Sequence, residues 1–122
     1  LVTLASCSDC HTPSERGTPI AGREFAGGQE FRLPGHVLRS ANITPDATGI
    51  GNITEDAFVA RFRSYRVPPE QAEVPRPARM SFLRGNTIMP WRMYAGMSDD
   101  DLRAIYRYLR TLRPVHNVVP RG

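Results

Sequence analysis

Two thiols and an imidazole lie close together near the start of this chain, in Cys7-Ser8-Asp9-Cys10-His11. The chain has 2 cysteines in all, and both are here. Cysteines three positions apart lie on roughly one face of a helical turn, where both can form thioethers with vinyl groups on one edge of a porphyrin. The C-x-x-C-H spacing is the pattern of covalent haem attachment and places the histidine beneath the iron. The motif therefore predicts one haem c bound through Cys7, Cys10 and His11.

Three other interpretations of the cysteine pair remain open: a structural disulfide, a thioredoxin-like redox pair and half of a zinc site. Zinc would need further ligands such as His36 or His116, which lie in distant and dissimilar contexts. A thioredoxin-like pair belongs near a βαβ pattern, which the flanking sequence does not offer. Haem attachment is favoured over all three.

The composition indicates one domain, residues 1–122, built around a large prosthetic group. Only 40% of the residues are hydrophobic, and 11 prolines with 10 glycines indicate much irregular backbone. A buried macrocycle would add apolar surface that such a chain lacks.

All 16 basic residues are arginine, and the formal net charge is +4. Codon bias explains the absence of lysine without any function, and the functional alternative is bidentate pairing with carboxylates of a partner or of the haem propionates. No recognised nucleic-acid-binding motif accompanies the arginines, so the sequence argues against a nucleic-acid partner.

No transmembrane run or signal peptide is visible, yet the chain runs from Leu1 straight into the motif. Fewer than two helical turns precede Cys7, and a helix that short is marginal by itself. We therefore expect the N-terminus to be incomplete, with a signal sequence or a membrane anchor among the segments that could precede Leu1.

Residues 12–52 are rich in glycine, proline and turn formers, which predicts a long ordered loop with short extended pieces around Phe25 and Phe31. Within this loop, residues 42–52 predict either a pair of Asx turns or hydrogen bonds to the haem propionates. Residues 67–87 are rich in proline and charge, which predicts a surface excursion.

A first helix is predicted at residues 54–66. Thr54 is a good N-cap, and two acidic residues that complement the helix dipole follow it. Phe58, Phe62 and Tyr65 recur on one face, so we expect them to pack in the core against the haem.

A second helix is predicted at residues 98–113. Ser98 can cap it, aspartates load its first turn and arginines its last, as the helix dipole favours. Adjacent aspartates point in different directions, so they do not indicate a metal site. The apolar stripe comprises Leu102, Ile105, Tyr106, Leu109 and Leu112.

Completing a low-spin iron on its second face requires nitrogen or sulfur. The candidates are Met80, Met89, Met93, Met97, His36 and His116. Met89 precedes a proline, which favours extended backbone and presentation of the thioether from a loop. Met97 directly precedes the Ser98 cap, where packing accounts for it. Met93 and then Met80 are the closest rivals, and both histidines are interpreted as surface residues.

These features together resemble a class I cytochrome c. More narrowly, the chain resembles the haem domains of the cytochrome c subunits of bacterial membrane-bound alcohol, aldehyde and gluconate dehydrogenases. That match rests on residues 7–13, 26–28, 42–46, 48–52, 89–91 and 98–109. The chain departs from the pattern at Gly35-His36, where Phe-Gly is common, at Ile53, where an aromatic residue is common, and in having one haem motif instead of three.

The resemblance implies an all-α, loop-rich cytochrome c fold with helices packed around one covalently bound haem c. It implies that Cys7 and Cys10 are the thioether attachments and that His11 and Met89 are the axial iron ligands. An iron with both axial positions filled exchanges one electron and has no open site for substrate. We therefore expect an electron carrier, not an enzyme, between a dehydrogenase or other respiratory donor and a downstream oxidase or cytochrome.

Two alternatives remain. One is a peroxidase-like enzyme with an open or labile sixth site, and the other is a haem relay domain of a larger redox complex. Thioethers to haem form outside the cytoplasm, so the resemblance implies the periplasm or the outer face of the bacterial cytoplasmic membrane. Membrane association would then come through a partner or a missing anchor.

Overall fold

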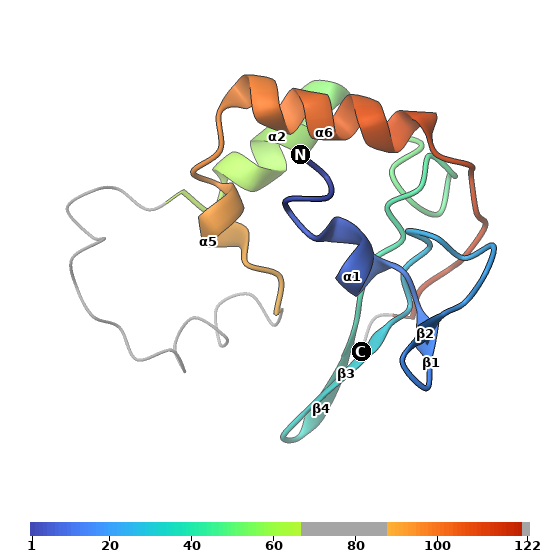
Figure 1. The fold of residues 1–122 in the computed structure, drawn as a ribbon. Coiled ribbons are helices and arrows are strands. Elements are labelled where there is room, and N and C mark those ends of the chain that lie inside the picture. The colour runs from blue at the N-terminus through green and yellow to red at the C-terminus, as the bar shows by residue number, and fades with distance from the viewer. Residues whose placement is uncertain (67–87, 121–122) are drawn as a thin grey trace.

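The computed structural model describes residues 1–66 and 88–120 (Figure 1). The predicted surface excursion at 67–87 lies outside the described residues. In chain order, the elements are α1 (Cys7–His11), β1 (Ser14–Glu15), β2 (Thr18–Pro19), β3 (Glu30–Leu33), β4 (His36–Arg39), α2 (Glu55–Arg63), α5 (Trp91–Tyr94) and α6 (Asp99–Thr111).

Helices α2 and α6 begin at the predicted caps. Thr54 Oγ1 accepts a hydrogen bond of 3.2 Å from the backbone N–H of Ala57, and Ser98 Oγ accepts one of 3.1 Å from that of Asp101. Each cap satisfies an N–H group that has no partner within its helix, which stabilises a helix by about 1 kcal/mol. Both helices end two or three residues earlier than the pattern predicts.

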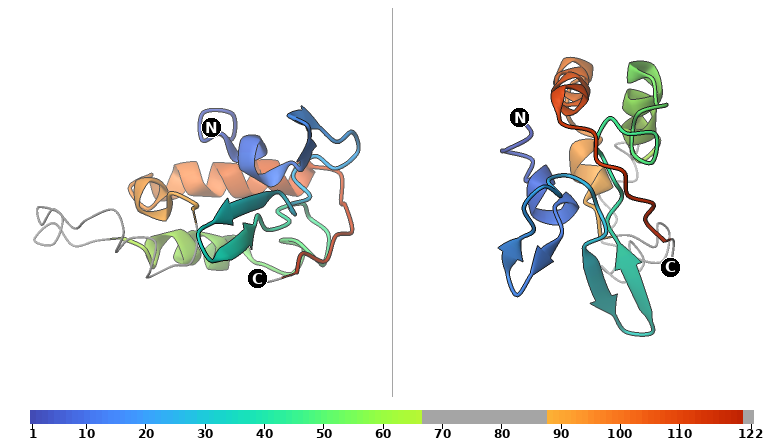
Figure 2. Two further views of the ribbon diagram at one scale, coloured as in Figure 1. Left: turned by 90° about the horizontal axis from the view of Figure 1, so that it is seen from below. Right: turned by 90° about the vertical axis from the view of Figure 1, so that its right-hand side faces the viewer.

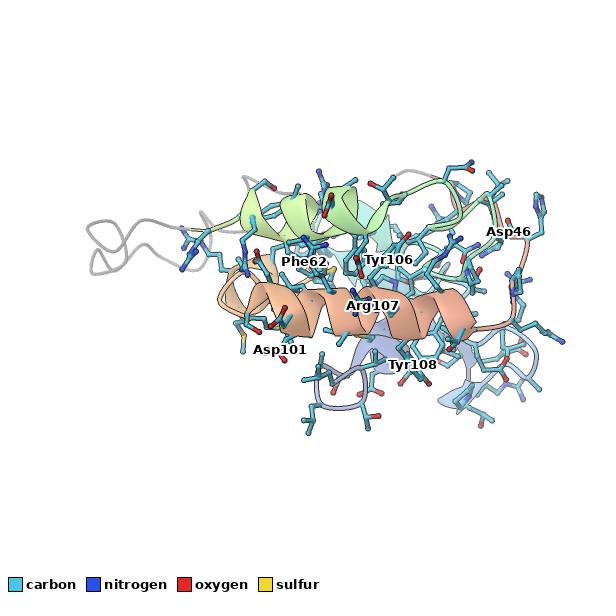
Figure 3. The ribbon with its side chains drawn as sticks, turned by 90° about the horizontal axis from the view of Figure 1, so that it is seen from above. Asp46, Phe62, Asp101, Tyr106, Arg107 and Tyr108 are labelled. Carbon is cyan, nitrogen blue, oxygen red and sulfur yellow. The ribbon has the colours of Figure 1, made fainter. Side chains whose placement is uncertain are left out.

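The core lies mainly between α2 and α6, which run side by side (Figure 3). The Phe58 ring centroid is 5.0 Å from that of Phe62 and 5.4 Å from that of Tyr106. Figure 3 shows Phe62 and Tyr106 between the two helices and Tyr108 on the other side of α6. The buried apolar cluster comprises Val2, Ile50, Phe58, Val59, Phe62, Leu102, Ile105 and Leu109. The predicted burial of Phe58 and Phe62 is therefore confirmed, whereas Tyr65 follows the end of α2 and is only half-buried. Packing of these rings against the haem stays a prediction.

Arginines of α6 form ion pairs with carboxylates of α2. Arg103 Nη1 lies 3.2 Å from Glu55 Oε2 and 2.8 Å from Asp56 Oδ1, and Arg107 Nε lies 2.7 Å from Glu55 Oε1. Isolated surface pairs contribute little, but several charges sharing partners form a network that holds the helices in register. These arginines therefore pair with carboxylates inside the chain itself.

Strands as well as helices are present, so the all-α prediction holds only in part. β1 and β2 form one antiparallel hairpin, and β3 and β4 form a second, in which Phe31 pairs with Leu38. The extended piece predicted around Phe31 is confirmed. Phe25 instead has a φ of 59°, with its N–H bound to Thr12 Oγ1 and its carbonyl to the N–H of Ile43. Long-range hydrogen bonds override the local β preference of phenylalanine there.

Helices α1 and α5 lie on the same side of α6 in Figure 1, and the views in Figure 2 agree. The hairpins extend away from the α2 and α6 pair on that side as well. The cysteine motif and the start of α5 therefore approach one region from distant parts of the chain. None of the helices in the described ranges is long and apolar enough to cross a membrane.

We predict that Leu102→Ala lowers the free energy of unfolding by about 3 kcal/mol, because the side chain is fully buried (0% exposed) and its removal leaves a cavity. Denaturant unfolding of the holoprotein measures this change. Leu4→Ala is the control, because Leu4 is 86% exposed and its loss should change stability by less than about 0.5 kcal/mol. Equal effects of the two substitutions would contradict the placement of the core.

Candidate haem-binding site

The cysteine motif forms α1, as the sequence predicts. Cys7 is half-buried against the core, and Cys10 is exposed. Cys7 and Cys10 form no disulfide with each other, so the disulfide interpretation finds no support. A helix this short needs tertiary contacts, and the backbone N–H of Gly27 supplies one by donating a 2.7 Å hydrogen bond to the His11 carbonyl.

His11 is buried, with 9% of its surface exposed. Its Nδ1 lies 2.7 Å from the carbonyl oxygen of Ala41. Because a carbonyl can only accept, Nδ1 carries the proton and donates, which leaves the lone pair on Nε2. Burial lowers the pKa of His11 more than this hydrogen bond raises it, so the ring is neutral. A neutral imidazole oriented by a carbonyl on its second nitrogen is what an iron ligand requires, so the site fits a haem.

Gly27 allows the Ala41 carbonyl to lie next to His11, because it has no side chain. Its φ is 70°, and a Cβ there would lie 2.3 Å from the carbonyl carbon of Ala41. Real Cβ atoms do not approach backbone so closely, so any side chain at this position would push Ala41 away from His11. The glycine therefore keeps the Ala41 carbonyl within hydrogen-bonding distance of the His11 ring.

The loop after Ala41 contains the predicted pair of Asx turns. The N–H of Thr44 donates to Asn42 Oδ1 at 2.9 Å, and the N–H of Thr48 donates to Asp46 Oδ1 at 2.8 Å. Asn42 Nδ2 also donates to the carbonyl of Val115 at 2.8 Å, which joins the C-terminal segment to this loop. Hydrogen bonding to the propionates stays a prediction.

Asp46, labelled in Figure 3, carries a carboxyl whose pKa is lowered by the Thr48 hydrogen bonds first and by His116 to a smaller extent. A lowered folded-state pKa means that this carboxylate adds stability at pH values above its unfolded-state pKa. That stability is lost as the pH falls through the folded-state pKa. The turn is therefore weakened by acid.

Met89 is half-buried, packs against the core cluster and lies just before α5. Met93 is 76% exposed, and the side chain of His116 is also 76% exposed. Met97 packs against the core before the Ser98 cap, as the sequence predicts. His36 is exposed at the start of β4, and Met80 lies outside the described residues.

Two features of the site escaped sequence analysis. The Ala41 carbonyl is backbone, so no side chain marks it. The turn residues on either side of it were the only available signal, and they indicated a loop without saying which oxygen faces His11. Tyr94 is the other feature: its hydroxyl donates a 2.6 Å hydrogen bond to the carbonyl of Ala5, two residues before the motif.

Residues 1–113 match the family of cytochrome c. The chain belongs to the cytochrome c family. Domains of this family carry haem c, bound covalently, and use it for electron transfer. Membership confirms the cytochrome c fold inferred from the motif and the capped terminal helix, while the two hairpins limit the all-α description.

The chain is also similar to cytochrome subunits of several bacterial dehydrogenases. The chain is 35% identical over 96% of its length to the cytochrome c subunit of a quinone alcohol dehydrogenase from Gluconobacter oxydans. It is 33% identical over 98% of its length to the cytochrome c subunit of a gluconate 2-dehydrogenase from Pantoea cypripedii. A fructose dehydrogenase cytochrome subunit from Gluconobacter japonicus is 31% identical over 99% of the chain. The chain spans 20% to 22% of the length of these relatives.

We predict that Gly27→Ala destabilises this cytochrome c more than Gly17→Ala does. Both glycines have positive φ, at 70° and 80°, so both substitutions incur backbone strain of about 1 to 2 kcal/mol. Only Gly27→Ala adds a clash with Ala41, because nothing lies within 4 Å of a Cβ at Gly17. Overpacking should add at least about 1 kcal/mol, measured by denaturant unfolding of the ferric holoprotein. Equal losses would contradict the tight approach to Ala41.

Proposed function

We propose that this cytochrome c is a one-electron carrier over a single monohaem domain, residues 1–122. Cys7 and Cys10 would attach the haem, and His11 and Met89 would bind its iron. The bound haem supplies the change between ferrous and ferric iron. The observation that carries the proposal is the buried, neutral His11 ring, fixed by the Ala41 carbonyl at 2.7 Å with Nε2 left to bind a metal.

The residues of this chain favour a carrier over a peroxidase-like enzyme. Met89 is a half-buried thioether beside the core, and a filled sixth position leaves no place for peroxide or another substrate. Axial methionine also raises the reduction potential relative to a second imidazole. A ligand pair held by packed elements lets the electron move with little rearrangement of the protein.

We propose that a dehydrogenase donates electrons to this carrier and that an oxidase or another cytochrome accepts them from it. The support is that the relatives named above are cytochrome subunits of alcohol, gluconate and fructose dehydrogenases. The site would lie in the periplasm or on the outer face of the cytoplasmic membrane, where haem is attached to cysteine. As a haem relay domain of a larger complex, the chain would perform the same chemistry.

We predict that Met89→Ala abolishes the sulfur-to-iron charge-transfer band of the ferric holoprotein. The potential should fall by on the order of 0.1 V, a fraction of the roughly 0.8 V that axial ligands span. Optical spectra and redox titration measure the two effects. Met93→Ala is the matched control and should change neither, because Met93 is 76% exposed.

An unchanged spectrum in Met89→Ala would exclude Met89 as the ligand. A high-spin spectrum in the unsubstituted protein, with peroxide or cyanide binding readily, would instead support the peroxidase-like alternative. Persistence of the charge-transfer band in the presence of these ligands supports the carrier.

We predict that the chain co-purifies with a dehydrogenase when it is isolated gently from its own cells. Mass spectrometry of the isolated complex identifies the neighbours. Reduction of the haem when that dehydrogenase receives its substrate would establish the direction of electron flow. Recovery of the protein with no redox partner, and no reduction by any dehydrogenase of the same cells, would contradict the assignment.

A further inference from the structure

We propose that Arg63 is a positioning residue that holds α5 in place and thereby keeps Met89 on the haem iron. This inference rests on the proposed ligation by Met89. Helix α5 has only 4 residues, and Met89 lies two positions before it. An isolated helix of that length is not stable in water, so its position depends on side chains from other elements.

The Arg63 guanidinium binds the chain where α5 ends and α6 begins. Its Nη1 donates to the carbonyl of Ala95 at 2.5 Å, and its Nη2 donates to the carbonyl of Met97 at 2.6 Å. Its Nε donates to Asp99 Oδ1 at 2.8 Å. One side chain therefore connects the last turn of α2 to the C-cap of α5 and to the first turn of α6.

The carbonyls matter more here than the ion pair. The Asp99 side chain is 59% exposed, and an ion pair with so exposed a partner contributes little because water screens it. Carbonyls at the end of a helix have no partner within the helix, and Ala95 is almost fully buried at 1% exposure. Removing the guanidinium would leave these oxygens poorly satisfied, so the α5 end would have to shift toward water.

Other contacts fix the remainder of α5. The Trp91 ring stacks on Tyr65 with centroids 4.7 Å apart and lies 5.1 Å from the Phe62 ring. Tyr94 is hydrogen-bonded to the carbonyl of Ala5. Arg63 is thus a polar attachment at one end of a short helix that is also held by aromatic packing, by the Tyr94 hydrogen bond and by the Arg61 guanidinium, which lies 5.5 Å from the Trp91 ring centroid.

A loosened α5 should be visible as easier loss of the sulfur ligand. The iron–sulfur bond competes with any added ligand, and the apparent affinity of that ligand rises with the fraction of protein in which Met89 has left the iron. Imidazole is a suitable probe because it binds ferric haem and abolishes the charge-transfer band. Its apparent affinity therefore reports on how firmly Met89 is held.

The experiment compares ferric Arg63→Met with ferric Arg103→Met by imidazole titration of the charge-transfer band. Arg103 also joins α6 to α2, through Glu55 and Asp56, and its side chain is 31% exposed against 24% for Arg63. It therefore controls for general weakening of the helix pair. We expect Arg63→Met to bind imidazole about tenfold more tightly than the unsubstituted protein, and Arg103→Met to bind it within about twofold.

The outcomes distinguish failure of the Met89 ligation from failure of the role proposed for Arg63. An unsubstituted protein without the charge-transfer band would refute the ligation by Met89 itself. A normal band with equal imidazole affinity in the unsubstituted protein and in Arg63→Met would refute only the role of Arg63. Equal tightening in both arginine variants would show a general effect of stability and overturn the proposal as well.

Arg63→Lys serves if Arg63→Met gives no folded holoprotein. Lysine keeps the charge but cannot present the planar set of donors that reaches two carbonyls and a carboxylate together. Tighter imidazole binding than in the unsubstituted protein supports the proposal. Unchanged binding overturns it.

Discussion

One hydrogen bond, from the His11 ring to the Ala41 carbonyl, joins the haem motif to a loop 30 positions further along the chain. It fixes which nitrogen carries the proton and how the ring is turned, and the proposed binding of iron by His11 depends on both. The surrounding irregular backbone is arranged about that one oxygen. Gly27 leaves room for that oxygen, and Asn42, the residue after Ala41, is hydrogen-bonded to the carbonyl of Val115 in the C-terminal segment. Gly27 and Asn42 therefore both help to hold this one acceptor in place.

The opposite side of the proposed iron site is held by side-chain contacts to a short helix and not by a network of turns. There the proposed ligand, Met89, precedes a short helix, α5, which is held by the stacked Trp91 and Tyr65 pair, by the Tyr94 hydrogen bond and by Arg63. A backbone carbonyl within a network of turns is difficult to displace, whereas a helix of 4 residues held by a few side chains can be loosened by one substitution. We therefore expect single substitutions to disturb the iron site more easily on the Met89 side than on the His11 side.

The sequence predicts what local interactions determine. Thr54 and Ser98 act on N–H groups of their own first helical turns, so both helices begin where the pattern places them. Asn42 and Asp46 likewise act two residues ahead, which makes their turns predictable. Phe25 and Ala41 differ because their partners are remote in sequence: Thr12 and Ile43 force a positive φ on one, and His11 selects the carbonyl of the other. The partners of Arg63 were hidden for the same reason, since a helical arginine gives no sign of which carbonyls it will meet.

The most direct test of a carrier ligated by His11 and Met89 is X-ray absorption at the iron edge of the purified ferric holoprotein. The predicted result is a first coordination shell with one sulfur scatterer together with the pyrrole and imidazole nitrogens, unchanged when peroxide is added. A shell of nitrogen alone, or an iron with an open position that peroxide fills, would contradict the account.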